Sequence, residues 1–428
     1  MSRPGPNFRT TAVSSSAVVR PSLLDPRLVS GLLALLVCAC AGPGPEPGGA
    51  VVAPGDEAGK VESAPDSLDS NLDSGDPSSW VSQAERALER GEPARAATLF
   101  ARFLGRGSDG DEARRAYRGL AQAHEQLGDF DAAIRAYDGF LARFPEDPQA
   151  HQMLARRGAC EAEVAAWDRS AASYLGVLEL GGDALVPSQR VEALARRGFA
   201  LYQLGNFDDA DAVFAEADAI YERATEAGEE RFSDTYFVAM ARFYRAAILH
   251  LEFRAAPIRL PEAQMDKDFA AKLALLEQAQ DAYNEVVSAR HLYWVSAAGY
   301  QLGSLFEEFY DAIMYAPVPD WLDEEQRRIY YLELEEQLRP VVDKATWVFE
   351  KNLETARKFG YDNFFIQQTE AQLAHLQAVL LGRGEIGGPV SRLAPRESRR
   401  DPDPDAPTPT DQLPAAERKL FVPMPTTL

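Results

Sequence analysis

The sequence predicts an all-α protein, built as a solenoid of helix hairpins with a disordered tether before it and a disordered tail after it. The central part is rich in Ala, Leu, Glu and Arg, whereas both ends are rich in Pro, Gly, Ser and Asp. A short motif also recurs in the centre, and its copies begin at Gly91, Gly128, Ala165 and Gly205, which are 37, 37 and 40 residues apart. A period of about 20–50 residues is typical of repeat architectures, in which each unit packs mainly against its neighbours.

Each copy of the motif follows an Ala-rich stretch with helical periodicity. In the second copy, Gly128 closes the first helix and Phe130 fills the corner two residues later. The small side chain of Ala133 then lets the second helix approach the first closely. Tyr137 fills the space between stacked hairpins, and Pro145 ends the second helix. The motif therefore predicts two packed helices in each repeat.

These residues resemble the tetratricopeptide repeat, a helix hairpin of about 34 residues. The resemblance covers residues 80–225 and implies a right-handed α-solenoid whose concave face binds other proteins. The copy that begins at Ala165 is degenerate, and the first copy has Pro93 where an aromatic residue is expected. The positions that match best are Tyr117, Leu120, Ala121, Gly128, Phe130, Ala133, Tyr137 and Pro145, followed by Gly198, Gly205, Phe207, Ala210, Phe214 and Ala217.

Residues 226–382 continue the helical pattern in longer hairpins, which are either further repeats of this kind or a separate capping domain. Asp323 and Gln326 have the spacing of a helix N-cap with a reciprocating side chain. Pro340 falls within a helical run, so it either kinks that helix or divides it in two. Residues 316–361 resemble the C-terminal part of repeat proteins from deltaproteobacteria, including the lipoprotein of the myxobacterial gliding-motility machinery.

Residues 1–40 have the features of a bacterial lipoprotein signal peptide. Four arginines precede an apolar run at residues 28–40, which is too short for a comfortable membrane span. The run ends in Val37, Cys38, Ala39 and Cys40, which resembles a lipobox with Cys40 as the lipidated residue. The alternatives are an ordinary signal peptide cut near Ala41 or an uncleaved anchor, and the long basic region leaves open a start downstream of Met1.

Residues 41–79 and 383–428 are expected to be a disordered tether and a disordered Pro-rich tail, since neither composition can form a core. Ala41, rather than Asp, follows the lipidated cysteine. By the sorting rule of enteric bacteria this implies the outer membrane, with the protein on its periplasmic side. Residues 419–424 form a short apolar patch in the tail, which either docks on another surface or has no partner.

The charge and the cysteines exclude several classes of function. The net charge is -22, and the first forty residues contribute about +3, so the remainder is more acidic still. Nucleic-acid binding needs a basic face, which this chain does not offer. Cys160 is the only cysteine after residue 40, and it has no CxxC neighbour, so we expect a buried and unreactive thiol.

No arrangement of residues in the sequence predicts catalysis. Residues 105–110 and 382–387 match G-x-G-x-x-G, but neither follows a strand or opens a βαβ unit. His124 begins a metalloprotease-like pattern whose second histidine is replaced by Gly128. The other histidines lack the spacing of metal ligands, and no hydrolase or phosphate-binding motif is present. The sequence therefore predicts no enzyme, no cofactor and no metal.

The resemblance implies which residues face a partner. In that family, the residues at four fixed distances before the turn glycine line the concave face. Counting back from Gly128 and Gly205 gives the candidates Arg115, Arg118, Gln122, Glu125, Glu192, Phe199 and Tyr202. The two aromatic residues either line the groove or pack against the next hairpin, and the two arginines either contact a partner or are solvated.

Together these features predict a non-catalytic protein-interaction scaffold, anchored by a lipid in the outer membrane. Its partners would be other envelope proteins, bound through the concave face in a machine such as that of gliding motility. One alternative is an accessory lipoprotein for outer-membrane protein assembly, or for coordinating peptidoglycan and cell division. Another is a structural spacer whose tether and tail set a distance.

Overall fold

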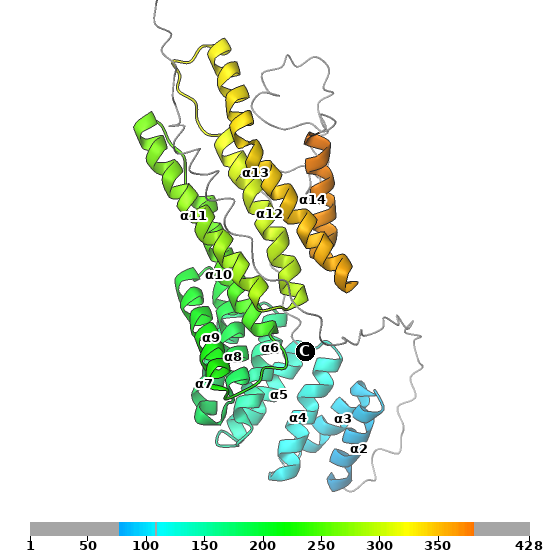
Figure 1. Cartoon of the computed structure of the whole chain (residues 1–428). Coiled ribbons are helices and arrows are strands. Elements are labelled where there is room, and N and C mark those ends of the chain that lie inside the picture. The colour runs from blue at the N-terminus through cyan, green and yellow to red at the C-terminus, as the bar shows by residue number, and fades with distance from the viewer. Residues whose placement is uncertain (1–76, 108, 381–428) are drawn as a thin grey trace, which may run out of the picture.

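The computed structural model describes residues 77–107 and 109–380, and these form an α-solenoid without strands (Figure 1). The predicted signal peptide with Cys40, most of the tether, and the tail lie outside the described residues. The helices are α2 (Pro77–Glu89), α3 (Pro93–Leu104), α4 (Asp111–Gln126), α5 (Phe130–Arg143), α6 (Ala150–Glu163), α7 (Trp167–Gly181), η1 (Gly182–Ala184), α8 (Pro187–Gln203), α9 (Phe207–Ala227), α10 (Tyr236–Ala255), α11 (Glu262–Ser288), α12 (Leu292–Met314), α13 (Glu324–Phe359) and α14 (Phe364–Leu380).

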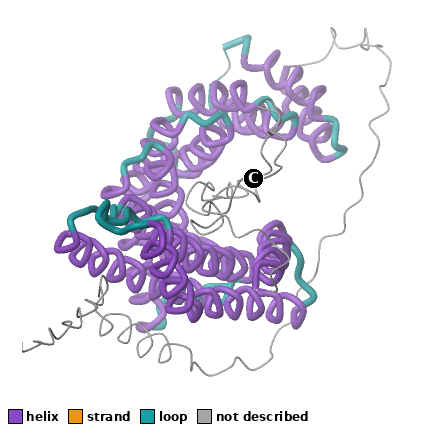
Figure 2. Tube along the Cα trace, turned by 90° about the horizontal axis from the view of Figure 1, so that it is seen from above, coloured by secondary structure: helices purple, strands orange, loops and turns teal. Residues whose placement is uncertain are grey.

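Each α-helix packs against the next one along the chain, and the series follows an arc when viewed from above (Figure 2). Among helices two apart, the pairs in substantial contact are α2 with α4, α8 with α10, α10 with α12, and α12 with α14. No odd-numbered pair packs in this way within the described residues. Since neighbours lie closer on the inside of a curve than on the outside, the even-numbered helices form the concave layer.

The predicted turns are confirmed. Gly128 and Gly205 have φ of 71° and 78°, a left-handed conformation that glycine adopts without steric cost. After the first of these turns, the Asp129 N–H donates to the His124 carbonyl at 2.9 Å, which is the bond expected of a Schellman cap. Ala165 occupies the same place in its repeat at φ of 54°, and so adopts a conformation unfavourable for a residue with a Cβ.

A small residue beneath an aromatic ring holds each of two hairpins together. Gly198 of α8 lies under Phe214 of α9, and an added Cβ would come within 2.6 Å of the ring. Gly303 of α12 lies under Phe349 of α13 in the same way. The longer helices after residue 226 therefore use a packing device of the shorter repeats.

The start of α13 confirms the predicted cap. Asp323 accepts a hydrogen bond from the Gln326 N–H at 2.8 Å, and the Gln326 side chain accepts from the Asp323 N–H at 2.9 Å. The helix then runs for 36 residues through Pro340, so the proline does not divide it. At the other end of the solenoid, α2 begins at Pro77, inside the predicted tether, since proline is favoured in the first turn of a helix.

The largest core extends from α8 to α14, and a buried polar network lies within it. Glu308 accepts hydrogen bonds from Arg254 Nε at 2.6 Å and lies 3.0 Å from His250 Nε2. The other ring nitrogen of His250 is 3.1 Å from the Tyr283 hydroxyl. Burial alone would raise the pKa of Glu308, but the His250 ring and the Arg254 guanidinium hold it below its usual value. These contacts join α10, α11 and α12.

Cys160 is buried, as predicted, and burial raises the pKa of its thiol. None of the helices described between residues 77 and 380 is both long enough and apolar enough to cross a membrane. Gly105 and Gly110, which bound the first G-x-G-x-x-G match, join α3 to α4 and not a strand to a helix. Within the described residues, no group of three or more His, Cys, Asp and Glu is placed to hold a metal ion.

Candidate partner-binding site

Three of the predicted site residues on α4, Arg115, Arg118 and Gln122, reach the surface, but the two arginines already have side-chain partners. Arg115 donates from Nε to Glu85 of α2 at 2.8 Å, a bond that raises the pKa of the guanidinium. Arg118 donates to Gln149, just before α6. Gln122 is exposed. The two arginines thus bridge neighbouring hairpins, and exposed bridges of this kind contribute at most about 1 kcal/mol.

Glu125 is a structural residue, which corrects its assignment to the binding face. Its side chain is only 5% exposed, and it accepts hydrogen bonds from the Tyr137 hydroxyl at 2.7 Å and from Arg156 Nε at 3.2 Å. The Cys160 thiol lies 3.4 Å from one of its oxygens. Because residues of α5 and α6 fill the acceptor positions of this carboxylate, it is not open to a partner.

Phe199 and Tyr202 are core residues, so the packing alternative is correct for both. Phe199 is 2% exposed and Tyr202 is 8% exposed. Their rings lie 5.1 Å and 5.0 Å from the ring of Tyr244 in α10, and Phe199 also meets Trp167 edge-on. These rings fill the space between α8 and α10, where an exposed groove was expected.

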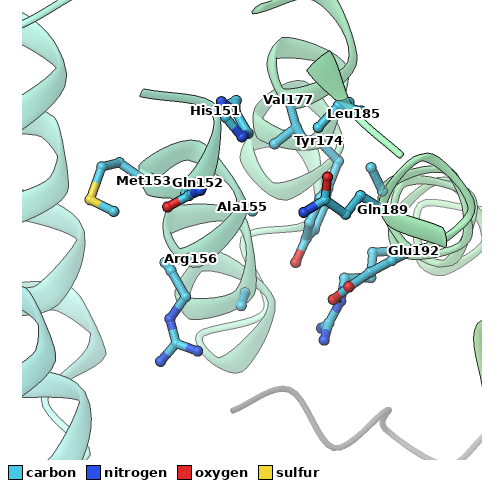
Figure 3. Close-up of a pocket in the computed structure, with 13 residues that line it drawn as sticks. His151, Gln152, Met153, Ala155, Arg156, Tyr174, Val177, Leu185, Gln189 and Glu192 are labelled. Carbon is cyan, nitrogen blue, oxygen red and sulfur yellow. The ribbon is translucent and has the colours of Figure 1, made fainter. Parts of the chain in front are cut away.

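An open groove lies one step earlier in the concave layer, between α6 and α8 (Figure 3). In the described structure these two helices hardly touch, unlike α8 and α10. The space between them is a cavity of about 310 Å³, with a floor made by Tyr174 and Val177 of α7 together with Leu185. Its walls include Ala155 and Ala159 of α6. Methyl groups on both turns of α6 leave room that a larger side chain would fill.

The rim of this groove is polar. Arg196 donates from Nε to Glu192 at 3.0 Å, and its guanidinium also lies over the ring of Phe237. The side chains of His151 and Gln152 line the cavity and form no hydrogen bond with another described residue. Burial raises the pKa of Tyr174 to about 12, so the floor is uncharged at neutral pH. An apolar floor beneath polar rim groups suits a side chain inserted from an extended peptide.

Only Glu192 among the seven predicted residues lines this cavity. Most of the lining comes from the degenerate repeat, whose turn is at Ala165. Counting back from Ala165 by the same four distances gives Gln152, Ala155, Ala159 and Ala162, and the first three of these line the cavity. The signal was therefore present in the repeat register, although alanine by itself does not suggest a site.

Residues 114–157 match the tetratricopeptide repeat family. This range spans most of α4, all of α5 and half of α6, which forms one wall of the groove. No curated protein matches the sequence.

Three of the solved structures that match the chain do so with low identity and a low TM-score. One contains the TPR-like repeats of a Podosopora anserina putative kinesin light chain, with 14% identity, a TM-score of 0.33, and coverage of 48% of this chain and 96% of that one. A tetratricopeptide repeat protein from Parabacteroides merdae shares 12% identity with a TM-score of 0.32, over 70% of this chain and 98% of that one. The apo form of RapI shares 10% identity with a TM-score of 0.37, over 72% of this chain and 99% of that one.

Proposed function

We propose that this protein is a non-catalytic scaffold that holds a segment of a partner protein in the groove between α6 and α8. The cavity in the concave layer is the observation that carries the proposal. Solenoids of stacked helix pairs use their concave surface for binding, and extended peptides or helices are the usual occupants of such grooves.

The lining indicates what kind of segment fits. At about 310 Å³, the cavity is at the small end of ligand pockets, so it accommodates one or two side chains and not a large cofactor. Tyr174, Val177 and Leu185 favour an apolar side chain at the bottom. The imidazole of His151 and the amide of Gln152 can then hydrogen-bond the backbone of the same segment at the rim.

We further propose that Cys40 carries a lipid that anchors the scaffold in the outer membrane of a bacterium, facing the periplasm. The apolar run that ends in Val37, Ala39 and Cys40 supports this proposal. An envelope machine of the gliding-motility kind is the proposed assembly, and the resemblance of residues 316–361 supports it.

Affinity purification from crosslinked envelopes tests both parts separately. The tagged wild type is compared with Ala155→Phe, which fills the groove, and with Cys40→Ala, which removes the lipid site. Gln122→Phe serves as the matched control, because it adds the same ring to the concave layer outside the cavity. We expect Ala155→Phe to lose a protein that wild type and Gln122→Phe retain.

The Cys40→Ala variant should no longer be found in the membrane fraction, but it should still bind the purified partner. Recovery of the same proteins by wild type and Ala155→Phe would contradict the groove as the site, and unchanged fractionation of Cys40→Ala would contradict the anchor. Motility proteins among the partners support the proposed assembly, whereas barrel-assembly or cell-wall proteins contradict it in favour of an accessory lipoprotein.

A further inference from the structure

The outward side of α13 carries a row of exposed apolar residues. Ile329 is 46% exposed, Leu332 is 48% exposed and Trp347 is 39% exposed. Ile329 and Trp347 are 18 residues apart, which is five turns at 3.6 residues per turn, so they lie on one line along the helix. Leu332 lies beside that line at helical spacing. We call these three residues and the exposed positions between them the outer stripe of α13.

The first half of the outer stripe is acidic. The exposed carboxylates are Glu333 and Glu336, each four residues after Ile329 or Leu332, and Asp343, seven residues after Glu336. Exposed Arg339 offsets one of these three charges, so the net charge stays negative. None of the three forms an ion pair or hydrogen bond with another described residue. The stripe therefore offers apolar contact next to unpaired carboxylates.

α12 packs along the opposite side of α13, but the outer stripe itself stays exposed in the described structure. With 36 residues, α13 is about 54 Å long, whereas the 17 residues of α14 extend for about 25 Å. Ile366 of α14 packs with Leu353 and Ala356 of α13, which places α14 beside the C-terminal half. Figure 1 shows the first half of α13 extending beyond α14. Terminal units of solenoids need a cover for such a face, because no further repeat stacks on it.

The negative charge of the outer stripe limits the kinds of partner that can bind it. A second copy placed symmetrically would set the same carboxylates against each other, and an anionic membrane surface would repel them. The partner that fits carries basic residues next to apolar ones. Residues 415–424 of this chain, AAERKLFVPM, have that composition, with Arg418 and Lys419 followed directly by Leu420, Phe421 and Val422.

The length of the chain between α14 and residues 415–424 also favours this segment. α14 ends at Leu380, and Figure 1 shows the C-terminal end of α14 near the middle of α13. The 34 residues from 381 to 414 can span roughly 110 Å when extended, which is twice the length of α13. A segment tethered at this distance has an effective concentration of about millimolar, so even weak binding would be largely occupied.

We propose that residues 415–424 dock in cis on the outer stripe of α13, with Leu420, Phe421 and Val422 against Ile329 and Leu332. Arg418 and Lys419 then face Glu333 and Glu336. The tail acts as the terminal cover of the solenoid and keeps this face from other proteins. This contact is independent of the groove between α6 and α8.

Limited trypsin digestion of the full-length protein, followed by mass spectrometry of the tail, tests the proposal. Arg418 and Lys419 are cleavage sites inside the docking segment, and Arg399 and Arg400 are control sites in the same tail. We expect cleavage at the first pair, relative to the second, to be about tenfold faster in Ile329→Ser/Leu332→Ser than in wild type, as docking at a millimolar effective concentration allows. Leu180→Ser, a change of an exposed leucine on α7, should leave the ratio unchanged.

A charge reversal sharpens the test. Glu333→Lys/Glu336→Lys should speed chymotrypsin cleavage after Phe421, and adding Arg418→Glu/Lys419→Glu should restore protection. Equal relative cleavage in wild type and in Ile329→Ser/Leu332→Ser would overturn the proposal. Protection that falls when the protein is diluted twentyfold would also overturn it, since the tail would then bind a second copy.

Discussion

The concave layer is open between α6 and α8 and closed between α8 and α10, although both pairs belong to one series of repeats. In the closed groove, Phe199 and Tyr202 of α8 meet Tyr244 of α10. In the open groove, α6 presents Ala155 and Ala159. The difference shows that side-chain size at two or three positions decides whether a groove of this solenoid is filled as core or stays open.

The charged groups near the two grooves differ in their exposure to solvent. Next to the open groove, Arg156 pairs with Glu125 while much of its side chain still reaches solvent. In the closed region, Glu308 is buried against His250 and Arg254. A charge that reaches solvent tolerates the loss of its partner, whereas a buried charge does not. The loss of a charge partner should therefore cost more in the closed region than beside the open groove.

The largest expected effect comes from opening the closed groove. Phe199→Ala should lower the free energy of unfolding by about 3–5 kcal/mol, because a buried ring is lost and a cavity remains. Urea denaturation followed by circular dichroism measures it. Leu127→Ala, at an exposed leucine, is the control and should change stability by less than about 0.5 kcal/mol. A loss below about 1 kcal/mol for Phe199→Ala would show that this ring is not part of the core.

The next effect concerns the two charge networks. Glu308→Gln should cost about 3 kcal/mol at pH 7, since it leaves Arg254 without a counter-charge in the core. Glu125→Gln should cost less, because Arg156 can be solvated. The pKa of Glu308 is lowered by folding, so its contribution is complete above the ordinary carboxyl pKa and is lost as pH falls through the folded value.

Unfolding free energies measured from pH 7 to pH 3 therefore have a definite expected pattern. The difference in the free energy of unfolding between wild type and Glu308→Gln should stay constant above the pH range in which ordinary carboxyl groups titrate. It should narrow at lower pH. A gap that widens on acidification would contradict the assigned direction of the shift.

The next variant has a smaller expected effect and distinguishes a loss of binding from a loss of stability. Ala155→Phe should weaken the binding of a purified partner at least tenfold, or about 1.4 kcal/mol, by occupying the cavity. Its free energy of unfolding should change by less than about 1 kcal/mol, since the ring enters existing space. Gln122→Phe should change neither quantity. A parallel loss of stability and binding in Ala155→Phe would mean that the groove is structural.

The smallest expected effect lies in the turn that follows α6. Ala165→Gly should raise the free energy of unfolding by about 1 kcal/mol, because glycine adopts the left-handed conformation without strain. Gly205→Ala, at the equivalent turn after α8, should lower it by a similar amount. Thermal unfolding of the two variants checks this pair, and the same sign for both changes would contradict the equivalence of the turns.

The features predicted correctly from the sequence are those that depend on local chemistry. The turn at Gly128 and the cap at Asp323 each follow from residues a few positions apart, and the hairpin period follows from the recurrence of that turn motif every 37–40 residues. The solenoid follows from repeating these units. Buried Cys160 was also predictable, since the segment around it has helical periodicity and no redox partner.

The site was harder to predict because it depends on contacts between repeats. Glu125 has the register of a binding residue, but Arg156, 31 residues later, occupies its carboxylate. Phe199 has the same register and is covered by Tyr244 of α10. The cavity arises where alanines leave space, and a missing side chain gives no sequence signal until the facing helix is known.

Site-specific photocrosslinking in intact cells tests the central claim most directly. A photoreactive amino acid replaces Gln152 at the rim of the open groove or, as control, exposed Leu180 on α7. We expect a defined crosslinked protein from position 152, absent from position 180 and lost when Ala155→Phe is added. Crosslinks of equal yield from both positions, or an unchanged adduct with Ala155→Phe, would contradict the claim that this groove holds the partner.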